Sequence, residues 1–342
     1  MIRTGWWAGM ALMLMAAADA VAAPGSGIVP LAYGSSQLPT TAMVVAGGLA
    51  DGRFILYDGN GDIWIESGRG AGNYAKVASG YFGDPGFIAV APDGHRCLVS
   101  SGYTGMLWLF DANAPVNAGS PLVTLSGGYW AAWLDNQKLL IDCATWVGPG
   151  QFDYQANVVV LDTTTHHVGT VITGGRTASA ALSIGNGFAY VTDGITGATN
   201  RFAVADLLNA YATATPINWP ASPNFGTFNA GGASAVTNSG ALIFQGNSVQ
   251  YVDANGNVLG TDTPNTAVPY PFYTAAYNPA TGNVLVVSTD WTNGWPPIVT
   301  GWGSDEPYDN PPVAMPVSGP MGLLLLTAAV AALGLRRGRR CA

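Results

Sequence analysis

The chain has 342 residues, of which 9% are charged, 11% are aromatic and 46 are glycine. This aromatic content is sufficient for a buried core and excludes an intrinsically disordered chain. When Arg3, Asp19 and the four arginines of the C-terminal tail are set aside, 7 Lys/Arg remain against 19 Asp/Glu, a net charge near −12. Nucleic acid is therefore excluded as a partner, because phosphate binding requires clustered Lys/Arg.

The N-terminus has the three parts of a secretory signal peptide. Arg3 supplies the positive charge, residues 6–18 form an apolar run, and Ala20-Val21-Ala22 is a cleavage site of the A-x-A type. We therefore expect residues 1–22 to be a helical signal peptide that is cleaved between Ala22 and Ala23. An uncleaved membrane anchor is the alternative.

The middle of the chain repeats one strand-and-turn plan. The turn after the first strand of each unit recurs at about 42, 42, 50, 53 and 42 residues, and a period of ~40–50 with four strands is typical of a β-propeller. We therefore expect an all-β chain in which residues 23–308 form a single propeller of six four-stranded blades, or seven if a longer spacing hides two. The last unit lacks a fourth strand, and residues 28–32 are expected to supply it.

The second unit shows the plan best, with apolar runs at 87–90, 97–99, 106–110 and 122–125. Asp93-Gly94 lies between the first two runs, where a turn needs residues that tolerate positive φ or bond their own backbone. The four strands expected in the fourth unit are 179–184, 188–192, 201–204 and 212–215.

Three segments resemble the repeats of YVTN-type propellers. Residues 157–175 read as a Val-rich strand, Asp-Thr, a turn and a strand that ends in glycine, which is similar to the outer half of such a repeat. Residues 190–193, Tyr-Val-Thr-Asp, are similar to the strand that names the repeat, and residues 91–94 to its strand-to-strand turn. The resemblance implies a class that includes sugar-lactone hydrolases, haem- or quinone-linked oxidoreductases and surface binding proteins, so it does not select a function.

The C-terminal end has three parts: a Pro-rich linker at 309–318, an apolar segment at 319–335 and a basic tail at 336–342. The apolar segment is long enough for a transmembrane helix, and Arg336 and Arg337 should remain cytoplasmic. This organisation resembles the PEP-CTERM and IPTL-CTERM sorting tails, with Pro316 and Gly322 at matching motif positions. The resemblance implies a Gram-negative bacterium, the export machinery, a membrane-embedded sorting peptidase of the exosortase type and a final place in the periplasm or at the cell surface. A plain tail anchor without processing is the alternative.

Catalytic, metal and cofactor motifs are not recognised in the sequence. Asp58-Gly-Asn-Gly-Asp62 resembles half of a calcium loop, but Asn60-Gly61 predicts a type I′ hairpin turn there instead. The three histidines, at 95, 166 and 167, are interpreted as solvated turn residues. We therefore predict no catalytic residue, no metal site and no cofactor, and consider an enzyme the less favoured reading.

Two further questions stay open at the level of the sequence. The acidic residues Asp142, Asp153 and Asp193 could either form a carboxylate site at the ring centre or serve as turn residues. Cys97 and Cys143 could be buried thiols, or a disulfide in an exported protein.

Aromatic side chains gather in the long loops that we expect on one face of the ring. Rigid scaffolds usually carry their binding residues on such loops, and exposed aromatics suit sugars or a protein partner. The candidate ligand-binding residues are Trp146, Tyr154, Trp219, Trp291 and Trp295. We expect an exported, membrane-tethered propeller that binds a glycan or a protein. The alternatives are a lactonase-like hydrolase and a structural matrix protein.

Overall fold

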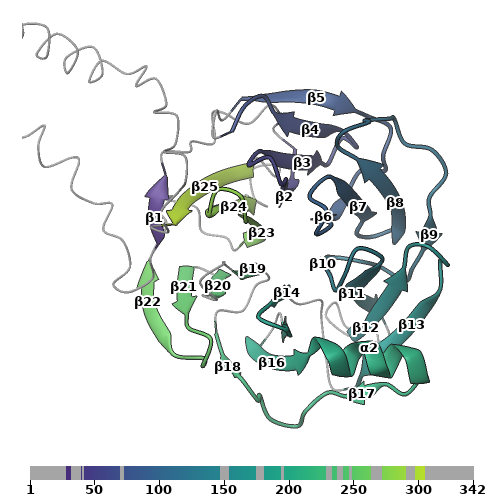
Figure 1. Cartoon of the computed structure of the whole chain (residues 1–342), viewed down its shortest axis with the longest axis vertical. Coiled ribbons are helices and arrows are strands. Elements are labelled where there is room, and N and C mark those ends of the chain that lie inside the picture. The colour runs from purple at the N-terminus through teal and green to yellow at the C-terminus, as the bar shows by residue number, and fades with distance from the viewer. Residues whose placement is uncertain are drawn as a thin grey trace, which may run out of the picture.

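The structure is a computed structural model, and it describes residues 28–31, 40, 42–69, 73–146, 154–174, 181–193, 196–228, 233–236, 242–245, 249–262, 272–289 and 297–304. These residues form six antiparallel sheets arranged around a central axis, which confirms the predicted all-β propeller (Figure 1). The sheets are called blades 1 to 6 in chain order. The innermost strand of each blade contacts that of the next, and blade 6 contacts blade 1, so the ring is closed.

Each of the first three blades is a meander from the axis outwards. Blade 1 contains β2 (Val44–Gly48), β3 (Phe54–Asp58), β4 (Ile63–Glu66) and β5 (Tyr74–Ala78). Blade 2 contains β6 (Pro85–Val90), β7 (Arg96–Ser101), β8 (Met106–Asp111) and β9 (Val123–Thr124). Blade 3 contains β10 (Trp130–Trp133), β11 (Lys138–Trp146), β12 (Tyr154–Asp162) and β13 (Val168–Thr173).

The other three blades follow the same order, with one insertion in blade 4. Blade 4 contains β14 (Leu182–Gly185), β15 (Phe188–Thr192), β16 (Ala198–Ala203) and β18 (Gly226–Thr227). Blade 5 contains β19 (Ala233–Val236), β20 (Leu242–Gln245), β21 (Val249–Val252) and β22 (Val258–Asp262). Blade 6 contains β23 (Phe272–Asn278), β24 (Asn283–Thr289), β25 (Pro297–Ser304) and β1 (Ile28–Leu31).

The ring closes by pairing the two ends of the propeller. Strand β1 is the outermost strand of blade 6 and lies antiparallel to β25, with Ile28 opposite Ser304 and Leu31 opposite Gly301. The predicted use of the N-terminal strand to complete the last unit is confirmed. This arrangement protects the edge that β25 would otherwise expose to another chain.

The hydrophobic core lies between blades. Alternate residues of a strand face opposite neighbours, so Ile55 and Tyr57 pack toward Ile88 and Val99 of blade 2, whereas Phe54 and Leu56 pack toward Leu285 of blade 6. Equivalent clusters join blades 2 and 3, 3 and 4, and 4 and 5. The sheets are thus held to one another by side-chain packing.

Blade 4 departs from the expected pattern of strands. The prediction of a strand at 212–215 is wrong, because the chain after β16 forms helix α2 (Val204–Thr213), whose Leu207 and Ala210 are buried against blades 3 and 4 (Figure 1). The chain then adds β17 (Ile217–Asn218) in parallel to β13 of blade 3 before it returns as β18. Ala and Leu favour a helix here, and the helix ends at Ala214, which adopts the left-handed conformation.

The turns between first and second strands of blades 1, 2 and 3 are built on an acidic side chain. Asp51, Asp93 and Asp135 occupy the same place in blades 1, 2 and 3, and each accepts hydrogen bonds from backbone N–H groups two or three residues later. In blade 4 the turn is Asn186-Gly187, with φ of 54° and 79°, which is the type I′ form. Their repetition indicates a structural role.

Acid is expected to weaken the turn at Asp93. Burial alone would raise the pKa of Asp93, but the N–H groups of Arg96 and His95 and the Arg96 guanidinium outweigh it and lower the pKa. A carboxylate with a lowered pKa in the folded state stabilises the fold above its unfolded pKa of ~3.9, and this stability is lost as the pH falls through the folded value. The urea midpoint should therefore fall below about pH 4, and the fall should be shallower in Asp93→Asn. An equal slope in both proteins would contradict this role.

The two cysteines that the structure describes are free thiols. Cys97 in β7 and Cys143 in β11 are both buried, so the disulfide alternative is not adopted. Burial raises the pKa of both thiols, which suppresses the reactive thiolate. Cys341 lies outside the described residues.

Thiol labelling should report unfolding. In a Cys341→Ser variant, a thiol reagent is expected to modify neither Cys97 nor Cys143 at neutral pH until denaturant unfolds the chain, and then both. The measurement is the number of labelled thiols by intact mass. Rapid labelling of one thiol under native conditions would show that its blade opens locally.

The predicted signal peptide, the Pro-rich linker, the transmembrane segment and the basic tail lie outside the described residues. Within the part of the chain that is described, no helix has the length and apolar character needed to cross a bilayer. The expectations for both ends therefore remain predictions.

Candidate functional site

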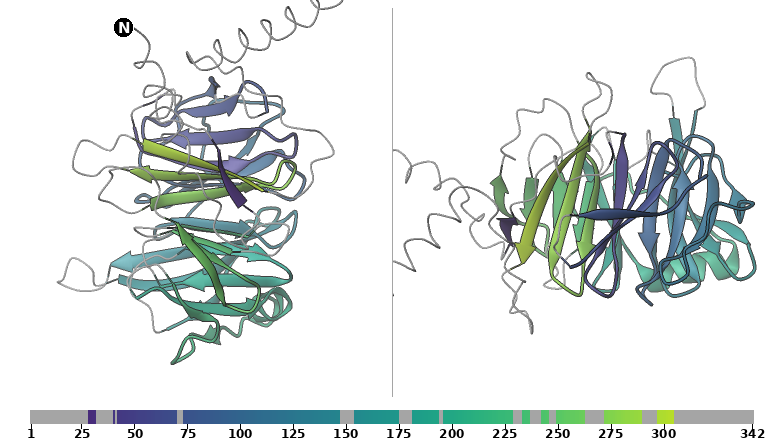
Figure 2. Two further views of the ribbon diagram at one scale, coloured as in Figure 1. Left: turned by 90° about the vertical axis from the view of Figure 1, so that its left-hand side faces the viewer. Right: turned by 90° about the horizontal axis from the view of Figure 1, so that it is seen from above.

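The propeller has two distinct faces. Strands alternate in direction, so the blade-to-blade connections and the loops between second and third strands lie on one face, here called the loop face. The turns between first and second strands and those between third and fourth strands lie on the other, here called the turn face. Figure 2 shows the ring from its side.

Three aromatic residues lie in neighbouring connections on the loop face around blade 2, and together we call them the aromatic patch: Phe82, Tyr103 and Tyr129. The side chain of Tyr103 is 82% exposed and that of Phe82 is 51% exposed, whereas Tyr129 is partly buried. Large aromatic side chains normally bury most of their surface, so two exposed ones on neighbouring loops suggest a contact surface.

Hydrogen bonds fix the loops of the patch to each other. Asp84, which has a φ of 76°, accepts a bond from the Tyr103 N–H through its carboxylate and from the Gly102 N–H through its carbonyl, at 2.8 and 2.9 Å. The Tyr57 hydroxyl donates to the carbonyl of Phe82. Burial, followed by the charge of Asp84, raises the pKa of Tyr57, so this hydroxyl stays protonated as the donor.

A glycine lets the third ring join the patch. Any Cβ at Gly102 would lie 2.7 Å from the ring of Tyr129, so the absence of a side chain allows this ring to rest on the backbone of the Tyr103 loop. Tyr129 also stacks at a tilt on Trp130, with ring centroids 5.9 Å apart. These contacts fix the backbone of the connections, and the rings of Phe82 and Tyr103 are left exposed on them.

The predicted binding residues are distributed differently. Trp146 ends β11 and Tyr154 begins β12, and they are cross-strand partners at the loop-face end of the longest hairpin described. Trp219 lies in the crossover after α2 and packs on Phe202, 6.0 Å between centroids, in the cluster between blades 3 and 4. Trp291 and Trp295 lie outside the described residues. The structure therefore brings Trp146 and Tyr154 together as cross-strand partners and places Trp219 elsewhere, in packing contact with Phe202. A ligand role for all five residues stays a prediction.

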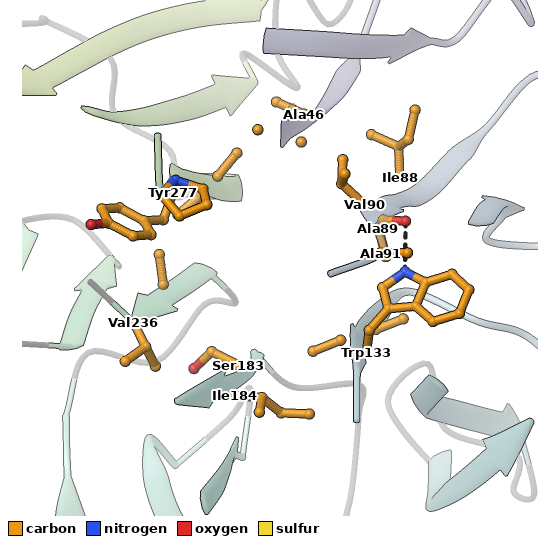
Figure 3. Close-up of a pocket in the computed structure, with 18 of the residues that line it drawn as sticks. Ala46, Ile88, Ala89, Val90, Ala91, Trp133, Ser183, Ile184, Val236 and Tyr277 are labelled. Carbon is orange, nitrogen blue, oxygen red and sulfur yellow. Dashed lines mark hydrogen bonds between the residues drawn. The ribbon is translucent and has the colours of Figure 1, made fainter. Parts of the chain in front are cut away.

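A cavity of about 340 Å³ lies on the axis of the ring (Figure 3). Its wall is formed by the innermost strands and consists mainly of Ala, Gly, Val and Ile residues, with Trp133 and Tyr277. The hydroxyls of Ser183 and Ser234 bond to each other at 3.0 Å within it. Because the wall includes Ala50 and Gly94 of the first turns, the cavity reaches the turn face.

The acidic residues considered for the ring centre do not line this cavity. Asp142 and Asp193 are buried. Asp142 lies in β11, the second strand of blade 3, and Asp193 directly follows β15, the second strand of blade 4, so neither lies in an innermost strand. Asp193 accepts the N–H of Thr196 in its own turn. Asp153 is outside the described residues. A carboxylate site at the ring centre is thus not formed by the described pair.

The calcium-like segment is a hairpin turn, as predicted, but of another type. Asp58 accepts the N–H groups of Asn60 and Asp62 and the indole N–H of Trp64, so its oxygens serve the turn. Gly61 has a φ of 80° but Asn60 does not have a positive φ, so the type I′ assignment is wrong. Among the described residues, no three His, Cys, Asp or Glu side chains gather as a metal site would need.

The sequence analysis did not predict the aromatic patch, because it selected binding residues from the long loops. Phe82, Tyr103 and Tyr129 all lie in short connections, two of which join blades. In the sequence, each of the three is simply an aromatic residue next to a glycine. This pattern gains meaning only because the fold places the three connections on one face.

Comparison with known proteins supports the fold. No family model and no curated protein matches the chain. Among solved structures, it is similar to the calcium-binding protein regucalcin from Agrobacterium tumefaciens, with a TM-score of 0.54 and 12% identity over 77% of this chain and 91% of that one.

Two further structures are similar to a comparable degree. A gluconolactonase from Xanthomonas campestris gives a TM-score of 0.54 at 12% identity, over 81% of this chain and 89% of that one. A chain of a nidogen–laminin complex gives 0.53 at 12%, over 69% and 85%. At such identities the likeness shows the fold alone, and the fold that it shares with this chain is the β-propeller.

Proposed function

We propose that this protein is an exported β-propeller, tethered to the membrane by its C-terminal segment, that binds a glycan through the aromatic patch. The observation that carries the proposal is the exposure of Phe82 and Tyr103 on loops that hydrogen bonds hold rigid. Aromatic rings stack on the apolar faces of sugars, and the exposed carboxylate of Asp84 beside them can accept hydrogen bonds from sugar hydroxyls.

The test is binding of a panel of neutral oligosaccharides to the purified full chain in detergent. We expect a member of the panel to bind, and Phe82→Ser and Tyr103→Ser each to weaken it about tenfold, which is 1.4 kcal/mol. The matched control is Leu109→Ser, because Leu109 is 43% exposed but lies on β8 outside the patch. Equal binding by all variants, or a captured protein in place of any sugar, would contradict the glycan proposal.

A lactone hydrolase is the second candidate, and the comparisons favour it more than they favour glycan binding. The similar structures include a gluconolactonase and a calcium-binding protein. The propeller also has an axial cavity in which a small lactone could be held. The test is hydrolysis of gluconolactone by the full chain with and without added calcium. A rate above background would support this candidate, and the absence of hydrolysis both with and without calcium would contradict it.

A further inference from the structure

We infer that the propeller is tethered with its turn face toward the membrane, so that the loop face and its aromatic patch point away from the lipid. This inference rests on the proposed C-terminal tether. It identifies the partner as a ligand in the space beyond the membrane surface rather than the lipid headgroups.

The direction of the strands in blade 6 determines where the tether begins. Strand β23 follows a blade-to-blade connection and therefore runs from the loop face to the turn face; β24 returns, and β25 runs to the turn face again. Ser304, the last residue of β25, is consequently at the turn face. Any chain that follows it starts from there.

The N-terminal end leaves from the same point. Ile28 is the cross-strand partner of Ser304, and paired residues in an antiparallel sheet have Cα atoms about 4.5–5.5 Å apart. A signal peptide before cleavage and a tail afterwards would thus hold the propeller by the same edge of the turn face, and the orientation is the same in both states.

The point of attachment places the turn face nearer to the lipid than the loop face. The stretch between Ser304 and the proposed transmembrane segment, residues 305–318, can reach at most ~46 Å from the lipid. The loop face is further from the tether by the length of a strand, about 23 Å for the seven residues of β23. The average distance from the lipid therefore differs measurably between the two faces.

The turn face itself has little attraction for lipid, so the tether alone sets this orientation. Among the described residues of this face, Arg53 pairs with Asp51, Arg96 with Asp93, and Lys138 with Asp135 and Asp162. The Arg69 guanidinium donates to the carbonyl of Asp51. On the loop face, in contrast, Phe82 and Tyr103 would be suited to a membrane interface if they could reach it. Their position at the far face assigns them to a different partner.

Energy transfer from single fluorophores to a lipid acceptor tests the inference. The full chain with Cys341→Ser is reconstituted in phosphatidylcholine–phosphatidylglycerol vesicles that contain an acceptor lipid. Label is attached at Tyr103→Cys or Phe82→Cys on the loop face, and at Asn136→Cys or Thr164→Cys, which replace exposed residues of the turn face. The native Cys97 and Cys143 are buried and do not compete.

We expect transfer from both turn-face labels to exceed transfer from both loop-face labels at least twofold. Equal or reversed efficiencies in protein that stays with the vesicles would overturn the orientation but leave the tether intact. Protein that does not sediment with the vesicles would overturn the proposed tether, and the orientation with it.

Discussion

Replacement of Trp133 by alanine should lower the free energy of unfolding by about 3–5 kcal/mol, the range for truncation of a buried tryptophan. Trp133 ends β10, is 7% exposed and packs into the cluster between blades 2 and 3. Its indole N–H donates to the carbonyl of Ala89 in the innermost strand of blade 2, at 2.9 Å (Figure 3). One side chain therefore joins two blades at the axis, and urea unfolding monitored by circular dichroism measures its loss.

Two further variants separate packing from the hydrogen bond. Trp133→Phe keeps an aromatic ring but removes the N–H, so it should cost about 1–3 kcal/mol, because a buried carbonyl loses a partner. Trp219→Ala removes the same side chain from the partly buried outer edge of blades 3 and 4, and its cost should be smaller than that of Trp133→Ala. An equal or larger loss of stability for Trp219→Ala would show that packing at the axis contributes no more to the stability of the propeller than packing at its outer edge.

The sequence was informative wherever local rules determine structure. The turn residues Asp51, Asp93 and Asp135 bond their own backbone, so their spacing located the blades. The missing fourth strand of the last unit indicated ring closure, because an open edge is unfavourable.

The parts that depend on tertiary contacts could not be predicted in this way. The stretch that forms α2 and β17 ends in the β-branched residues Thr213, Thr215 and Ile217, which led to the prediction of a strand. Helix α2 forms instead because Leu207 and Ala210 pack between two blades. The aromatic patch brings together residues 82, 103 and 129, and only the ring shows that their short connections share one face.

The axial cavity sharpens the choice between the two candidate functions. Its wall of mainly small apolar side chains suits packing or an apolar guest. Among the described residues of the wall, the side chains that carry polar atoms are those of Ser183, Ser234 and Tyr277 and that of Trp133, whose indole N–H is bonded to Ala89. The patch combines aromatic rings with an exposed carboxylate, which is the chemistry of sugar recognition. The experiments on the patch should therefore come first.

A methyl group at Gly61 should destabilise the propeller by about 2–5 kcal/mol. Gly61 has a φ of 80°, which costs an L-residue about 1–2 kcal/mol, and overpacking typically costs about 1–3 kcal/mol more. A Cβ there would lie 1.8 Å from the carbonyl oxygen of Tyr81, so the turn between β3 and β4 must move away. The midpoint of urea denaturation measures the effect in Gly61→Ala.

Gly187→Ala is a matched control, because Gly187 has a φ of 79° and a Cβ there would meet nothing within 4 Å. It should cost only the conformational part, about 1–2 kcal/mol. The difference between the two variants measures the contact with Tyr81, whose ring packs edge-on against Tyr57, Trp108 and Phe110. Since Phe82 follows Tyr81 directly, Gly61→Ala should also weaken ligand binding at the aromatic patch, whereas Gly187→Ala should not. Equal losses of stability in the two variants would show that the backbone around Tyr81 yields, and that the patch is less rigid than its hydrogen bonds indicate.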